Sequence, residues 1–318
     1  MIIYILIFII SIVLIYFSGE WIVKGLMRMA RFLGWKEFVV AFFVMAFAAS
    51  LPNLFVGISS ALQKIPQLSF GDIAGNNLVA LTVAVALAAF FSKGGLPAES
   101  RTIQTTSVFT MVAAILPLIL ILDGTLSRIE GLLLIFFFAF YIFWLFSKKE
   151  RFTKVYNTHR VPPFKEFKTF IKDLGKVVLG IILLIGAAQG IIISAQFFAV
   201  SFNLSIILMG LLVTGFGSAL PEIYFAVVSA KKGESWMILG DLMGAVIIPT
   251  TLVLGIVAII CPIEIQDFSS FAIARFFLII TAMFFLFFVR TDRKITRKEA
   301  LFLLGTYITF VAVEILAI

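Results

Sequence analysis

The feature of this sequence that most constrains its fold is a series of apolar runs, each long enough to cross a lipid bilayer. A bilayer-spanning helix needs about 20 mostly apolar residues, and soluble domains carry only about 45–50% apolar residues. Here 62% of the 318 residues are hydrophobic and 13% are charged, which excludes a water-soluble globular fold. We therefore predict an all-α integral membrane protein. Its ten transmembrane helices are expected near 2–18, 38–62, 68–91, 103–122, 129–147, 176–200, 204–230, 236–261, 268–289 and 299–317.

Basic residues predict the orientation of these helices. Alternate breaks between the apolar runs contain 22 of the 25 Lys and Arg residues, and the exceptions are Lys64, Arg128 and Arg275. Loops rich in Lys and Arg stay in the cytoplasm, so we expect both termini outside the cell membrane. The longest break is strongly basic, and it divides the chain into a first half (1–147), a cytoplasmic linker (148–175) and a second half (176–318).

The polar composition argues against several classes of function. A single cysteine, Cys261, cannot form a disulfide within the chain, and a single histidine, His159, leaves no His/Cys cluster for zinc or iron. The net charge of +8 follows from the membrane topology, so nucleic acid is not an expected partner. No organic cofactor and no obligatory protein partner are expected, which leaves inorganic cations and membrane lipid.

An internal repeat relates the two halves. Leu51-Pro52-Asn53 corresponds to Leu220-Pro221-Glu222, and Gly71-Asp72-Ile73-Ala74-Gly75 corresponds to Gly240-Asp241-Leu242-Met243-Gly244. Both pairs are separated by the same 169 residues. Each half has five predicted spans, an odd number, so the second half must be inverted relative to the first. Inverted repeats are typical of secondary transporters, whose substrate site lies at the midplane between the halves.

The repeated Leu-Pro motif predicts a broken helix in each half. Proline lacks an N–H and frees the carbonyl four residues earlier, which belongs to Ala48 for Pro52 and to Gly217 for Pro221. Broken helices inside a membrane line a wet cavity or are covered by protein. Two equivalent breaks, with Glu222 directly after the second, favour an oxygen-lined cation site over two simple kinks. Nearby hydroxyl groups come from Ser50, Thr214 and Ser218.

Asp72 and Asp241 are acidic residues inside apolar spans, where a charge costs at least about 2.5 to 3.5 kcal/mol. Two interpretations remain open, an ion ligand and an N-terminal cap of a helix that begins after the preceding glycine. Asn76 is four residues after Asp72 and shares its helix face, so it is a further ligand candidate. The glycine pairs in 71–75 and 240–244 are GxxxG motifs, which predict close helix packing.

These motifs resemble those of the calcium/cation antiporter superfamily, and most closely its prokaryotic sodium/calcium exchanger branch. Each half of that family carries approximately G-[ST]-S-L-P-E followed by G-N-x-x-G-S. The counterparts here are 48–53 with 71–76, and 217–222 with 240–245. The resemblance implies ten helices in two inverted five-helix repeats. It also implies alternating access, with calcium and sodium as the transported ions competing for one midplane site.

The sequence departs from the family pattern at several positions. Asn53 replaces the first glutamate, and Asp72 and Asp241 replace the asparagine of each G-N pair. Nine residues after the motif glycines, where the exchangers have an amide or acid ligand, this chain has Ala80 and Pro249.

The resemblance therefore transfers most directly to Glu222, with Ser50 and Ser218 as oxygen donors. If Asp72 and Asp241 point inward, three carboxylates form a site for a divalent metal ion. If the two aspartates only cap helices, Glu222 alone suits a monovalent ion or a proton better. The full set of expected ion-binding groups is Glu222, Asn53, Ser50, Ser218, Asp72, Asp241, Asn76, Thr214 and the carbonyls of Ala48 and Gly217.

Three alternatives to a sodium-driven divalent cation antiporter follow from the same residues. A proton-coupled or monovalent cation antiporter is consistent with Glu222 as the only acid beside a break. A channel-like relative is consistent with the missing ligands. An intramembrane aspartyl protease would need a G-x-G-D motif, but the first glycine is replaced by Ser69 and Ile238. We therefore do not expect an enzyme.

Overall fold

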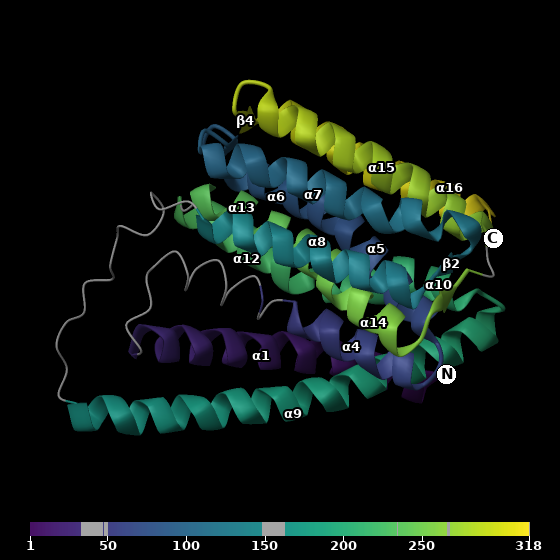
Figure 1. Ribbon diagram of the computed structural model, residues 1–318, viewed down its shortest axis with the longest axis horizontal. Helices are drawn as coiled ribbons and strands as arrows, with labels where there is room; N and C mark the ends of the chain where they lie inside the picture. The colour runs from purple at the N-terminus through teal and green to yellow at the C-terminus, as the bar shows by residue number, and fades with distance from the viewer. Residues whose placement is uncertain (33–46, 48–49, 148–162, 234, 266–267, 318) are drawn as a thin grey trace.

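The computed structural model describes residues 1–32, 47, 50–147, 163–233, 235–265 and 268–317, which form an almost entirely helical bundle (Figure 1). Eight helices are long and apolar enough to cross a membrane, and two shorter apolar helices, Ile2–Ser18 and Leu51–Leu62, complete the count. The prediction of ten spans in an all-α fold is confirmed. Part of the predicted span 38–62 lies outside the described residues.

The two halves contribute the following elements. The first half contains α1 (Ile2–Phe32), α4 (Leu51–Leu62), α5 (Pro66–Val79), the π-helix η2 (Ala80–Ala84), α6 (Val85–Phe91), α7 (Arg101–Leu120), the short turn η3 (Ile121–Asp123) and α8 (Arg128–Ser147). The second half contains α9 (Pro163–Phe202), α10 (Ile206–Met209), the π-helix η5 (Gly210–Thr214), α11 (Gly215–Ser218), α12 (Leu220–Lys232), α13 (Ser235–Ile247), the π-helix η6 (Ile248–Val253), α14 (Leu254–Ile260), α15 (Phe268–Arg290) and α16 (Arg297–Ala317).

Helices α1 and α9 are longer than the sequence predicted. They have 31 and 40 residues, and α9 begins inside the expected linker 148–175. Pro163 is compatible with the first turn of a helix, and the Lys and Glu residues that follow are good helix formers. Polar residues can thus end a hydrophobic span without ending the helix.

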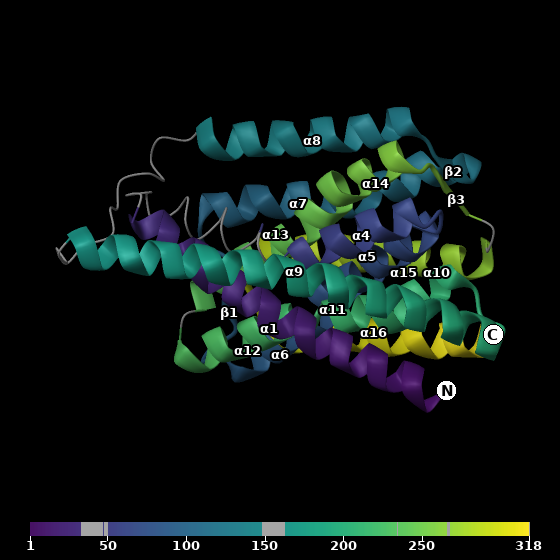
Figure 2. The ribbon, with the colours of Figure 1, turned by 90° about the horizontal axis from the view of Figure 1, so that it is seen from below.

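The α1/α9 pair lies along one side of the bundle, at an angle to the remaining helices (Figures 1 and 2). Their contact includes a hydrogen bond from Ser194 Oγ to the Tyr4 carbonyl oxygen at 3.1 Å, and a stacked pair of rings, Tyr4 and Phe197. A Cβ on Gly190 would lie 2.1 Å from Ser11 Oγ, so α9 packs closely against the α1 side chains at this glycine.

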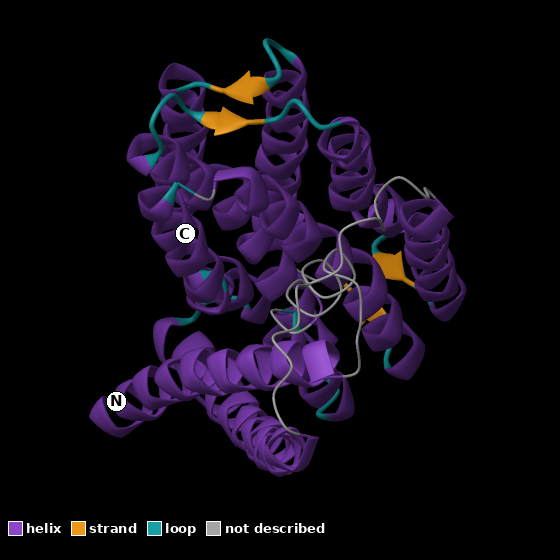
Figure 3. Cartoon of the chain, turned by 90° about the vertical axis from the view of Figure 1, so that its left-hand side faces the viewer, coloured by secondary structure: helices purple, strands orange, loops and turns teal. Residues whose placement is uncertain are grey.

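Two short antiparallel ladders connect the halves at opposite ends of the bundle. Strand β1 (Leu96–Pro97) pairs with β4 (Lys294–Ile295), and β2 (Thr125–Leu126) pairs with β3 (Ile263–Glu264). Each ladder therefore joins a loop of the first half to a loop of the second. Figure 3 shows these strands among the loops that connect the helices.

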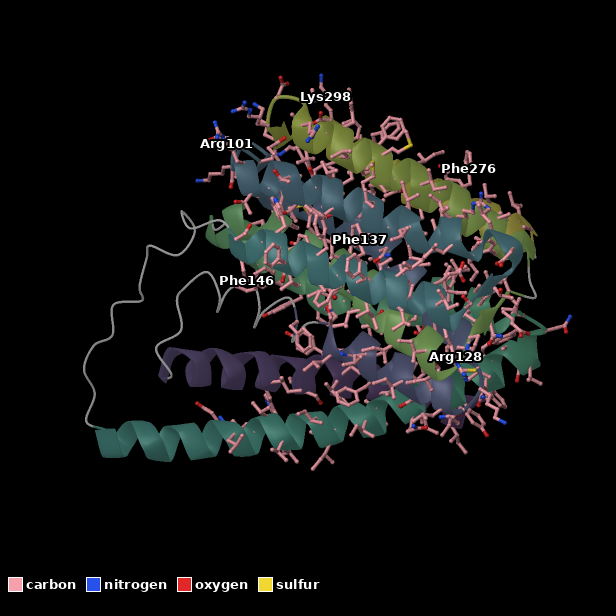
Figure 4. The ribbon with its side chains drawn as sticks, viewed as in Figure 1. Arg101, Arg128, Phe137, Phe146, Phe276 and Lys298 are labelled. Carbon is pink, nitrogen blue, oxygen red and sulfur yellow. The ribbon has the colours of Figure 1, made fainter. Side chains whose placement is uncertain are left out.

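The ends of the bundle differ in the loops they carry. Both termini lie at the β2 end, and β4 lies at the other end (Figure 1). Arg101 and Lys298 lie at the β4 end, whereas Arg128 lies at the β2 end (Figure 4). The basic loops 92–100 and 291–296, which the sequence placed on one side of the membrane, thus lie at the same end of the bundle.

The outside of the bundle is apolar, as expected for a surface that contacts lipid. Phe136, Phe143 and Phe287 are 72%, 74% and 60% exposed. By contrast, α5 is enclosed by other helices, and every residue from Leu68 to Val79 is buried. Polar residues on α5 therefore face the protein interior.

Candidate ion-binding site

The break predicted in the second half is present, and the residue before the equivalent helix of the first half has nearly the same backbone angles. Ser50, directly before α4, has φ −82° and ψ −6°. Ala219, which separates α11 from α12, has φ −82° and ψ −7°. These two residues are repeat equivalents, and each precedes a Leu-Pro pair. Since Pro221 has no N–H, it cannot bond the Gly217 carbonyl four residues earlier, as predicted; Ala48 lies outside the described residues.

The two intramembrane aspartates are not helix caps. Asp72 lies in the middle of α5, which begins at Pro66, and Asp241 lies in the middle of α13, which begins at Ser235. In a helix interior the backbone N–H groups already donate to carbonyls of the preceding turn. An aspartate at such a position finds no free N–H to cap. The capping interpretation is wrong because both helices begin about six residues earlier than the glycine motif suggested.

Glycine brings α5 into contact with the second half. A Cβ on Gly71 would lie 2.3 Å from the Ile207 carbonyl oxygen, and one on Gly75 would lie 2.2 Å from that of Leu211. The predicted packing role is confirmed for this GxxxG pair. For the equivalent pair, a Cβ on Gly240 would meet no described atom within 4 Å.

This close approach places α5 side chains against α11 in a connected polar network. Asn76 Nδ2 donates to Ser218 Oγ at 3.3 Å, and Ser218 Oγ lies 3.1 Å from Asp72 Oδ1, to which it donates. The Thr214 hydroxyl, in the adjoining π-helix η5, donates to the Gly210 carbonyl oxygen at 3.2 Å. Asp72 and Asn76 thus share one face of α5, as their spacing predicted, and that face meets the second half.

Glu222 joins the same network from the first turn of α12. Its side chain is 2% exposed and lies close to Asn76. It is also close enough to Asp72 and Asp241 for their charges to interact. The break in the second half therefore brings an acidic side chain directly to the polar face of α5.

Several polar atoms of this network, and both amide atoms of Asn53 in the first turn of α4, are buried without a partner among the described residues. They are Asn53 Oδ1 and Nδ2, Asp72 Oδ2, Asn76 Oδ1 and Glu222 Oε2. A buried polar group left unsatisfied costs about 1–3 kcal/mol, so such a concentration requires an explanation. Four of the five atoms are oxygens, and oxygens are the ligands that hard cations prefer.

The expected set of three carboxylates is not assembled as a compact metal cluster. Within the described ranges, no group of three His, Cys, Asp or Glu side chains comes close enough to hold a metal ion. Asp241 is partly exposed, whereas Asp72 and Glu222 are 1% and 2% exposed. Asp72 and Glu222 therefore belong to one buried network, and Asp241 acts on it through its charge. Ser50 is buried beside the first break.

Sequence reasoning missed the π-helices and the role of Asn77. The π-helices η2 and η6 occupy equivalent places in the two halves, directly after α5 and α13. Turns of this kind are frequent at functional sites. Pro249 could have indicated the irregular helix η6, because proline has no N–H to donate. The sequence of η2 has no proline and gave no such indication. Asn77, which was not among the expected ligands, donates to Thr250 Oγ1 in η6 at 2.8 Å.

Comparison with known proteins identifies the family. The family model described as sodium/calcium exchanger protein matches residues 3–147 and 173–316. The chain belongs to this family. Its members are membrane transporters rather than enzymes, and they carry inorganic cations.

Individual relatives match over almost the entire chain at low identity. An uncharacterized membrane protein of Methanocaldococcus jannaschii is 24% identical, with 96% of each chain covered. The sodium/calcium exchanger MaX1 of Methanosarcina acetivorans is 22% identical, with 97% of each covered. The solved structure of the sodium-calcium exchanger NCX_Mj has a TM-score of 0.67 at 22% identity, with 98% of each chain covered. The last likeness supports the two-repeat exchanger fold of this multi-pass membrane protein.

Proposed function

We propose that this cation antiporter exchanges calcium, or another divalent cation, for sodium by alternating access. The observation that carries the proposal is the group of buried oxygens of Asp72, Asn76 and Glu222 that have no partner among the described residues, next to the break between α11 and α12. A charged ligand at this place would satisfy them, and only a cation is attracted to carboxylate and amide oxygens.

The chemistry of the donors suits a divalent ion. Calcium takes six to eight oxygen ligands, including carboxylates and carbonyls. Asp72 and Glu222 offer two carboxylates from opposite halves, and Asn53 and Asn76 offer amide oxygens. The remaining ligands that we propose are the hydroxyls of Ser50, Ser218 and Thr214 and the carbonyls of Gly217 and Ala48.

We assign Asp241 an auxiliary role in this site. Its charge interacts with Glu222, so it favours the presence of a cation without joining the buried network. Asn53 supplies oxygen without charge where the exchangers supply a glutamate. The resulting site has two buried carboxylates, which balance the charge of one divalent ion or of two sodium ions.

The basic loops define the orientation that we propose. Loops that carry Lys and Arg remain cytoplasmic, so the β4 end with Arg101 and Lys298 faces the cytoplasm of a cell-membrane protein (Figure 4). Both termini and Arg128 then face outside. In this inverted arrangement, the second half approaches the site from the direction opposite to the first, as in other inverted-repeat transporters.

Counterflow in proteoliposomes tests the proposal. We expect uptake of labelled calcium to require an outward sodium gradient, and to be lost in the Glu222→Gln variant. Uptake driven by a proton gradient instead would show that the coupling ion is the proton and not sodium. Calcium entry that needs no counter-ion gradient would refute exchange and would indicate a channel.

A further inference from the structure

We infer that Asn77 is a positioning residue for ion exchange, because its hydrogen bond to Thr250 holds the π-helix η6 of the second half against α5 of the first. This inference rests on the proposed function. It assigns to Asn77 and Thr250 control of the cation affinity, although neither belongs to the proposed ligand set.

The two adjacent asparagines of α5 point to different partners. Successive residues of a helix are about 100° apart, so Asn76 and Asn77 cannot face the same neighbour. Asn76 donates to Ser218 in the ion-binding network, and Asn77 donates to Thr250 Oγ1 at 2.8 Å. One turn of α5 therefore contacts both the broken helix and the π-helix of the second half.

The hydrogen bonds define the direction of the Asn77 amide. Thr250 Oγ1 donates its only proton to the Val246 carbonyl oxygen at 2.6 Å, so it can only accept from Asn77. Asn77 must then present its NH2 group, and its Oδ1 atom points elsewhere. That atom is buried without a partner among the described residues, and Asn77 and Thr250 line a small cavity with room for about one water molecule.

The π-helix needs such support. Pro249 provides no N–H, and the wide turn interrupts the regular bonding of α13. The Thr250 and Thr251 hydroxyls bond the carbonyls of Val246 and Ile247, both at 2.6 Å. Of these two hydroxyls, only that of Thr250 also accepts a bond from the other half within the described part of the chain, so Asn77 connects the conformation of η6 to α5 and hence to Asp72.

The contact exists in one half only. The repeat equivalents of Asn77 and Thr250 are Val246 and Leu81, whose side chains cannot hydrogen-bond. The π-helix η2 of the first half therefore cannot make the corresponding side-chain hydrogen bond. This asymmetry distinguishes a specific positioning contact from a general requirement of the repeated fold.

Thr251 provides a matched control. It is fully buried in the same π-helix, and its hydroxyl makes the same bond to a carbonyl four residues earlier as Thr250 does. A Thr→Val change removes that bond at either position, but only at 250 does it also remove the contact with Asn77.

The experiment measures calcium-driven exchange in proteoliposomes containing Thr250→Val, Thr251→Val, Thr250→Ser, Asn77→Leu or the Asn77→Leu/Thr250→Val pair. We expect Thr250→Val and Asn77→Leu each to raise the half-maximal calcium concentration at least fivefold, with the maximal rate within twofold. The double variant should have the same half-maximal calcium concentration as either single variant, because both substitutions remove the same Asn77–Thr250 hydrogen bond. Thr250→Ser and Thr251→Val should behave as the unmodified protein.

Calcium-dependent thermal stabilisation of the purified protein is the second readout, and it should weaken in the same variants. Equal effects of Thr250→Val and Thr251→Val, or additive effects in the pair, would overturn the inference while leaving the proposed function intact. An unmodified protein that neither exchanges nor is stabilised by calcium would overturn both.

Discussion

Asp72→Asn separates the charge of this residue from its place in the fold. The amide oxygen of asparagine can still accept from Ser218, whose Oγ lies 3.1 Å from Asp72 Oδ1. Replacing a charge-assisted hydrogen bond by a neutral one changes stability by about 1 kcal/mol, and burying an amide costs less than burying a carboxylate. We therefore expect the cation-free variant to fold with nearly unchanged stability.

The effect on cation binding should be much larger. Two unit charges 4 Å apart interact by about 4 kcal/mol at an effective dielectric constant of 20, and a divalent ion doubles this. Because part of the gain is offset by desolvation, we take a 100-fold loss of affinity as the expected minimum. At a calcium concentration of 100 times the Kd, the unmodified protein gains about 2.7 kcal/mol of stability, whereas the variant would gain about 0.4 kcal/mol.

The assay compares thermal unfolding of purified protein with and without calcium in sodium-free buffer. Asp123→Asn is the control, because Asp123 lies on an exposed outer turn where its carboxylate accepts from Thr125 N at 3.0 Å. Asp241→Asn should have a smaller effect than Asp72→Asn, since Asp241 is partly exposed. Full calcium-dependent stabilisation of Asp72→Asn would refute the assignment of this charge to the cation site.

Three further predictions concern the same region. Glu222→Gln should abolish exchange, while the circular dichroism spectrum and the melting temperature without added cation stay unchanged. Normal exchange in this variant would show that Glu222 is not an ion ligand. Asn53→Glu should tighten calcium binding measured by calorimetry, because it adds a charge at a buried position whose amide atoms have no partner among the described residues; unchanged or weaker binding would mean that position 53 does not face the ion. Gly75→Ala should destabilise the protein by about 1–3 kcal/mol, since its Cβ would lie 2.2 Å from the Leu211 carbonyl oxygen, whereas Gly186→Ala, with nothing within 4 Å, should not. Equal melting temperatures of the two glycine variants would contradict that contact.

Features set by local chemistry were predictable from the sequence. The apolar runs predicted the spans because a bilayer imposes their length. Pro221 predicted the break between α11 and α12 because proline lacks a donor wherever it occurs. The Gly71 and Gly75 pair predicted close packing for a similar reason, since only glycine permits backbone contact at this distance.

Features set by tertiary contact were not predictable in the same way. The start of α5 at Pro66 decides that Asp72 lies within a helix, and the glycine motif misled because it resembles a helix start. Asn77 was not among the expected site residues, because its partner, Thr250, is 173 residues distant in the sequence. A single sequence contains no signal for a bond between these two residues.

The two strand ladders have a consequence for how the protein is made in the membrane. Strand β1 emerges from the ribosome with the first half, but its partner β4 lies between the last two spans, about 200 residues later. Until that loop is synthesised, the backbone donors and acceptors of β1 have only water or lipid headgroups beside them. The first five spans therefore cannot reach their final structure as they are inserted, and the bundle closes at this end only when α16 enters the bilayer.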